Sequence, residues 1–74
     1  MPKAQAAKIA DSADLIVGGY AMMNHELGFR IVNLNPGNAL IVSKDYNILE
    51  TSMEDLEVEV AIGYLKTNRS FMEV

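Results

Sequence analysis

The side chains that could do acid–base or nucleophilic chemistry are few. His25 is the single histidine and has Glu26 beside it, which makes this the one neighbouring pair that could act as a general base with an acidic partner. Adjacent side chains diverge in a strand, so the pair is not a preorganised dyad. A nucleophilic triad would also have to use His25. We therefore predict that the chain is not an enzyme and that His25 is an exposed turn residue.

Two other features could bind a ligand by their composition. Gly18-Gly19 lacks the further glycines, or the following Lys-Ser/Thr pair, that a phosphate-binding loop requires. Residues 50–59 hold five acids and no base, but they lack the alternating oxygens and the central glycine of a calcium loop. Without cysteines there is no thiolate site either. The sequence predicts no cofactor and no metal ion.

The same acidic stretch has two remaining interpretations. The first is a helix N-terminal turn with a solvated acidic face. The second is a contact face for a basic partner, which would make the chain an acidic inhibitor or an antitoxin-like protein that masks a nucleic-acid-binding surface. A separate alternative is a small-ligand-binding domain or very small enzyme, with its site at the few aromatic and titratable groups of the middle of the chain: Tyr20, His25, Arg30 and Tyr46.

Composition limits the elements that must position these groups. The chain has 74 residues, of which 50% are hydrophobic and 22% charged, so we expect one folded domain over residues 1–74. A single core of this size rarely supplies more than about 3 to 5 kcal/mol. Because the chain has no cysteine and one histidine, disulfides and multi-histidine zinc sites cannot add stability. Self-association is the remaining source, and we expect a homo-oligomer.

Net charge and the length of the apolar runs limit the classes of partner that we expect. Ten acids against six singly scattered bases give a net charge of −4, which argues against nucleic acid as the partner. The apolar run Leu15 to Met23 is nine residues long and a membrane span needs about 20, so we expect no membrane association and a cytoplasmic location.

The first third of the chain has two interpretations. We predict a short alanine-rich helix that ends near Ser12 to Asp14, followed by a strand over Leu15 to Met23 in which Gly18-Gly19 marks a bulge or a close contact. The alternative is one long helix from Lys3 to about His25. It is suggested by apolar residues spaced four and three apart: Ile9, Ala13, Ile16, Tyr20, Met23 and Leu27.

From Asn24 onward, turn clusters separate short apolar strips, which is typical of an antiparallel meander. Further strands are predicted at Phe29 to Leu34, at Ala39 to Val42 and at Ile48 to about Thr51. Asn35-Pro36-Gly37-Asn38 predicts a type II turn. The two middle strips would be the central strands of about four.

A helix is predicted from Met53 to about Thr67. Ser52 and Asp55 resemble a capping box, and acids in the first turn suit a helix N-terminus. The competing interpretation is a strand, because residues 56–62 alternate between apolar and polar for five positions. As a helix, the segment would have an apolar arc of about 240°, where one sheet face needs roughly 100°.

The width of that arc leads to the functional hypothesis. The fold is α+β, with an N-terminal helix, an antiparallel meander of about four strands and a C-terminal helix on one sheet face. We expect a non-enzymatic protein that acts through protein–protein contact, either self-associating or as an accessory or regulatory subunit. The predicted partner-binding residues lie on the helix and the apolar tail: Glu54, Asp55, Glu57, Val58, Ile62, Leu65, Phe71 and Met72.

Overall fold

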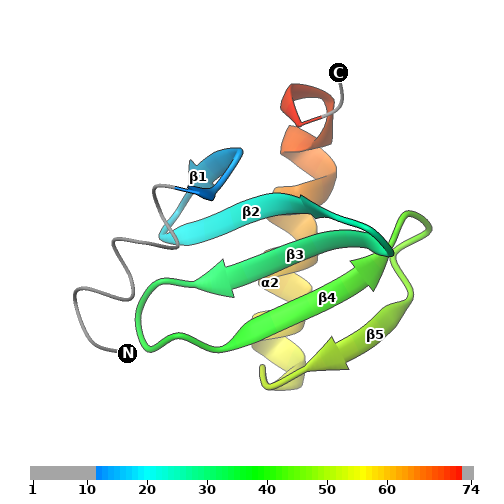
Figure 1. Cartoon of the computed structure of the whole chain (residues 1–74). Helices are drawn as coiled ribbons and strands as arrows, with labels where there is room; N and C mark the ends of the chain where they lie inside the picture. Colours follow the sequence, from blue (N-terminus) through cyan, green and yellow to red (C-terminus); the bar gives the residue numbers. More distant parts are fainter. Residues whose placement is uncertain (1–11, 73–74) are drawn as a thin grey trace.

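The computed structural model describes residues 12–72. Within this range an antiparallel sheet is followed by a helix that crosses one of its faces (Figure 1), so the α+β class is correct. The predicted N-terminal helix lies outside the described residues.

Five strands follow one another in the described part of the chain, and their order in the sheet is the order of the sequence. Their bounds are β1 Leu15–Val17, β2 Tyr20–His25, β3 Gly28–Asn33, β4 Ala39–Ser43 and β5 Ile48–Thr51. The long helix α2 covers Asp55–Asn68, and the one-turn 3-10 helix η1 covers Arg69–Phe71. The last three predicted strands are confirmed to within a residue.

The expectation of a single strand over Leu15 to Met23 is wrong, and so is the alternative of a helix across these residues. Gly18 and Gly19 have φ of 59° and 83°, and Val17 pairs with Tyr20. Two successive residues with positive φ form the tight turn that suits the twist of a β-hairpin. The glycine pair therefore divides the segment into β1 and β2, and the sheet gains a fifth strand.

Two local predictions also need correction. The turn between β3 and β4 is present, but the Asn35–Pro36 peptide bond is cis, where a type II turn has a trans proline. The capping box is absent, because α2 begins at Asp55 with Glu54 at the N-cap and no side-chain cap bond. The Ser52 hydroxyl instead accepts a hydrogen bond from the Ala39 amide at 3.0 Å and holds the end of β5 against β4.

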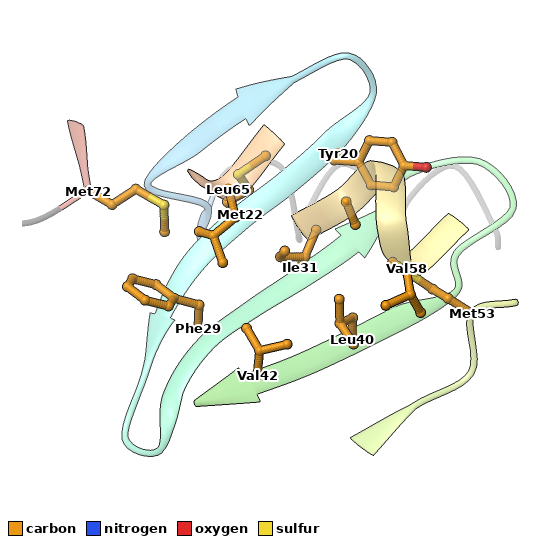
Figure 2. Close-up of a cluster of buried hydrophobic side chains, with 11 residues drawn as sticks. Tyr20, Met22, Phe29, Ile31, Leu40, Val42, Met53, Val58, Leu65 and Met72 are labelled. Carbon is orange, nitrogen blue, oxygen red and sulfur yellow. The ribbon is translucent and has the colours of Figure 1, made fainter. Parts of the chain in front are cut away.

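The core lies between the sheet and α2 (Figure 2). Alternate residues of the three middle strands point toward the helix, as the pairing of Met22 with Ile31 and of Ile31 with Leu40 requires. The helix contributes Val58, Ala61 and Leu65, all buried. Burial of a valine or leucine side chain stabilises a fold by roughly 1.5 to 3 kcal/mol, so these contacts fix α2 on this face.

The apolar tail folds back onto this core. Met72 is 2% exposed, and its carbonyl oxygen accepts a hydrogen bond from the Asn24 side-chain amide at 3.1 Å. Phe71, one residue earlier, is 75% exposed. The tail is therefore part of the fold at Met72 and part of the surface at Phe71.

Candidate partner-binding surfaces

The eight residues predicted to bind a partner divide between core and surface. Buried in the core are Val58, Leu65 and Met72; half-buried are Glu57 and Ile62; exposed are Glu54, Asp55 and Phe71. The structure brings Asp55, Val58 and Ile62 together in one groove, described next, whereas Phe71 lies apart at the end of the helix.

This groove lies between the last strand and the helix, and we call it the β5–α2 groove. It has a volume of about 450 Å³. Its walls are formed by Ile48 of β5 and by one side of α2: Asp55, Val58, Glu59, Ile62, Gly63 and Lys66. Ile48 pairs with Val42, whose side chain is in the core, so Ile48 also points to the helix side of the sheet. The groove is thus apolar at its base and charged along its helical wall.

The charges of the helical wall change sign along the groove. Asp55 and Glu59 lie at the end where α2 begins, and Lys66 lies at the other end. The Lys66 ammonium is 5.1 Å from the centroid of the Tyr46 ring, and the Arg69 guanidinium is 5.4 Å from the same ring. Cation–π contacts of this kind hold basic groups at the second end. The groove therefore has an acidic end and a basic end.

A second surface is the side of α2 that faces away from the sheet. It carries one residue from each successive turn, and we call it the outer α2 stripe: Leu56, Val60, Gly63 and Thr67. Leu56 is 73% exposed and Val60 is 42% exposed. An amphipathic helix normally puts polar residues on this side. The excess apolar arc expected from the sequence is therefore present, and this part of it is outside the core.

Gly63 is the least expected residue of the stripe. Glycine in a helix interior costs about 1 kcal/mol relative to alanine. A Cβ built at this position meets no atom within 4 Å, so the packing of residues 12–72 does not require glycine here. A second helix that crosses the stripe would benefit, because a glycine allows two helix backbones to approach closely.

Glu57 has a structural role on the other flank of α2. Its carboxylate accepts hydrogen bonds from the side-chain amides of Asn33 at 2.8 Å and Asn38 at 3.2 Å. These bonds tie the helix to the end of β3 and to the loop that follows it. The same charge, together with burial as the larger cause, raises the pKa of nearby Tyr20 above its usual value of 10.

The alternative small-ligand site is not assembled. Tyr20 packs against Tyr64 with ring centroids 5.6 Å apart, on the helix side of the sheet. Arg30 pairs with Met23 and lies on the opposite face, as does His25 at the end of β2, whose Nδ1 accepts a hydrogen bond from the Leu27 amide at 3.1 Å. Tyr46 lies in the β4–β5 loop. The four residues do not converge.

The opposite sheet face has a smaller hollow of about 290 Å³, lined by residues of β3, β4 and β5 such as Arg30, Ile41 and Glu50. In residues 12–72 no group of three or more histidine or acidic side chains could hold a metal ion. No helix in these residues is long and apolar enough to span a bilayer.

The predictions from sequence did not include three exposed apolar residues, Ile48, Leu56 and Val60. The helical wheel shows a broad apolar arc, but it does not show which part of the arc faces the sheet. One clue was available: Gly63 follows Val60 by three residues, and a glycine marks a poor position for a core contact.

Comparison with known proteins assigns the chain to a family. A family model described as a family of unknown function (DUF7723) matches residues 3–72. The chain belongs to this family. Its matched region includes all five strands and α2, so both surfaces described above lie within it. Searches of curated proteins and of solved structures returned no match.

Proposed function

We propose that this chain is a small non-enzymatic protein that acts through protein–protein contact, and that its first partner is a second copy of itself. The contact is made by the outer α2 stripe. As a homodimer it would serve as an accessory or regulatory subunit.

The observation that carries the proposal is the stripe itself. Leu56 and Val60 are exposed on the side of α2 where solvated side chains are expected, and Gly63 continues the same line although no packing contact within residues 12–72 requires a glycine there. Packing against a second helix would bury both apolar side chains and would use the glycine as the point of closest approach.

The charges beside the stripe favour an antiparallel pair of helices. Asp55 and Glu59 flank its first half and Lys66 flanks its second half. A two-fold axis near the middle of the stripe would place the acids of one copy near the lysine of the other, whereas a parallel pair would place like charges together.

Sedimentation velocity at high micromolar concentration tests the proposal. The wild type is expected to sediment as a dimer and Leu56→Glu as a monomer, because a buried unpaired carboxylate opposes association. Leu27→Glu is the matched control, since Leu27 is 59% exposed in the turn between β2 and β3. It should remain dimeric.

Two results would overturn the proposal. One is a wild type that is strictly monomeric at this concentration. The other is a dimer that Leu56→Glu and Leu27→Glu weaken equally, because the contact would then lie elsewhere.

A further inference from the structure

The strand beside the groove, β5, is an edge strand, and no other strand of residues 12–72 pairs with its outer side. β5 is the last strand of the sheet, and all four of its residues are exposed, with Ile48 at 53% and Leu49 at 48%. A row of unpaired backbone groups on such a strand can accept one more strand from another chain. Proteins use this as a recognition mode, in which backbone bonds supply affinity and side-chain pockets supply specificity.

The hydrogen bonds at the end of β5 show which groups are available. The Ser52 amide donates to the Ala39 carbonyl at 3.0 Å, so Ser52 faces β4. Thr51, the preceding residue, pairs with Leu40. Along an antiparallel strand, the residues before and after a hydrogen-bonded residue point their N–H and C=O groups away from the paired strand. The Thr51 N–H and C=O therefore point to the open edge.

The groove lies directly beside this edge and supplies the pocket. Ile48 is the β5 contribution to its wall, and Val58 and Ile62 face it from the helix. An added strand would place every second side chain on the helix side of the sheet, where the groove can receive it. An apolar side chain fits the base of this groove.

The charges along the groove determine where a basic residue of the partner would lie. The end of β5 leads within four residues to Asp55, so the Thr51 end of the edge is the acidic end of the groove. An incoming basic side chain would be attracted there, and an incoming acid would be repelled. Because every strand pair in residues 12–72 is antiparallel, we take the added strand to be antiparallel to β5. Its first residues then meet the acidic end.

We infer that β5 and the β5–α2 groove bind an extended segment of a different protein by β-strand addition. In that segment a basic residue precedes an apolar, β-branched residue by a few positions. The basic residue lies near Asp55 and Glu59, and the apolar residue enters the groove. This site adjoins the outer α2 stripe and shares Gly63 with it, but its apolar contacts, Ile48, Val58 and Ile62, are not stripe residues, so it is tested apart from the proposed self-association.

A library of random linear peptides displayed on phage is the probe. It is selected against the full chain carrying Leu56→Glu, which removes self-association as a competing event, and the enriched peptides are then measured on the wild type. The expected result is a set of peptides in which Lys or Arg precedes Val or Ile. Their binding should weaken about tenfold or more in Ile48→Glu and in Glu59→Lys.

Two variants are matched controls. Ile16→Glu makes the same change in the other edge strand, at a residue that is 46% exposed, and Glu26→Lys reverses a charge in the exposed β2–β3 turn. Neither should change affinity. Bound peptide should also slow hydrogen exchange of the Thr51 amide, which a peptide lying only on the helix would not do.

The inference is overturned if no peptide is enriched, if the enriched peptides bind Ile48→Glu as tightly as Ile16→Glu, or if they are acidic. It is also overturned if binding leaves exchange at Thr51 unchanged. Loss of dimerisation in Leu56→Glu with normal peptide binding would separate this site from the proposed function.

Discussion

Single glycines decide how the strands meet. Gly28 has φ of 154°, and a Cβ at this position would press against the Val42 carbonyl oxygen and lie 2.8 Å from the Ser43 Cα. Gly19 has φ of 83°, but a Cβ there would meet nothing within 4 Å. One glycine is thus required by conformation and by space, the other by conformation alone.

We therefore expect Gly28→Ala to lower the free energy of unfolding by about 2 to 4 kcal/mol, because β3 must move away from β4. Gly19→Ala should cost about 1 kcal/mol, the usual penalty of a left-handed residue with a side chain. Urea denaturation measures both. Equal effects of the two substitutions would show that the close approach of β3 and β4 is not required for stability.

Tyr20 makes a contribution to the free energy of unfolding that depends on pH. Its burial, and secondarily the charges of Glu57 and Tyr64, raise its pKa above 10. The folded state therefore holds the phenol proton more tightly than the unfolded state does. The stability linked to this group is complete below pH 10 and is lost as the pH rises through the raised pKa.

The Glu57→Gln variant should bring the pKa of Tyr20 back toward its usual value. It removes the carboxylate charge that repels the Tyr20 phenolate. Glu59→Gln, on the same helix, should leave it unchanged. The difference in tyrosinate absorbance between each variant and its Tyr20→Phe form measures this pKa. A pKa that does not respond to Glu57→Gln would remove Glu57 from the causes and leave burial and the Tyr64 charge.

At the scale of elements, α2 is positioned by its two flanks as well as by its buried side. Glu57 accepts bonds from Asn33 and Asn38 on one flank, and Lys66 contacts the Tyr46 ring on the other. These contacts set the rotation of the helix about its axis. That rotation puts Val58, Ala61 and Leu65 inside and leaves Leu56 and Val60 outside.

Glu57→Ala should lower the free energy of unfolding by about 1 to 3 kcal/mol, since both asparagine amides lose a charged acceptor. Glu59→Ala is the matched control on the exposed side and should change stability by less than about 0.5 kcal/mol. Thermal and urea unfolding of the two variants give the comparison. Similar losses from both substitutions would contradict an anchoring role for Glu57.

The elements differ in how far the sequence predicts them. The strands β3, β4 and β5 are predictable because glycine, proline and asparagine clusters separate short apolar runs. The helix is predictable from its acidic first turn and its length, although valine and isoleucine favour strands. The β1–β2 hairpin was missed because Gly18-Gly19 is compatible with a bulge as well as with a two-residue turn, and the pairing of Val17 with Tyr20 decides between them.

The candidate surfaces were less predictable for a physical reason. They depend on the rotation of α2, which is set by contacts between residues 19 to 24 positions apart in sequence, such as Glu57 with Asn38 and Asn33. The sequence therefore predicts an apolar surplus on the helix. It does not predict that Leu65 and Met72 are core residues or that Leu56 is a surface residue.

At the scale of the whole molecule, Gly63 links stability to association. Gly63→Ala should raise the free energy of unfolding of the monomer by about 0.5 to 1 kcal/mol, because alanine is the better helix former and the position has room for its methyl group. Urea denaturation at low concentration measures the first effect. The same substitution should weaken the dimer, because the added methyl groups separate the two helices, and sedimentation measures this second effect. A variant that is more stable and equally dimeric would remove Gly63 from the interface.

Disulfide trapping tests the central claim, that the outer α2 stripe faces a second copy across a two-fold axis. The chain has no cysteine, so one introduced thiol reports on one position. Val60→Cys should form a covalent dimer rapidly under mild oxidation, because Val60 lies near the middle of the stripe, beside the proposed two-fold axis, and a disulfide needs Cα atoms within about 7 Å of each other. Leu27→Cys, in the turn between β2 and β3, should cross-link only slowly through random encounters. Equal rates for the two variants at the same protein concentration would contradict the proposed interface.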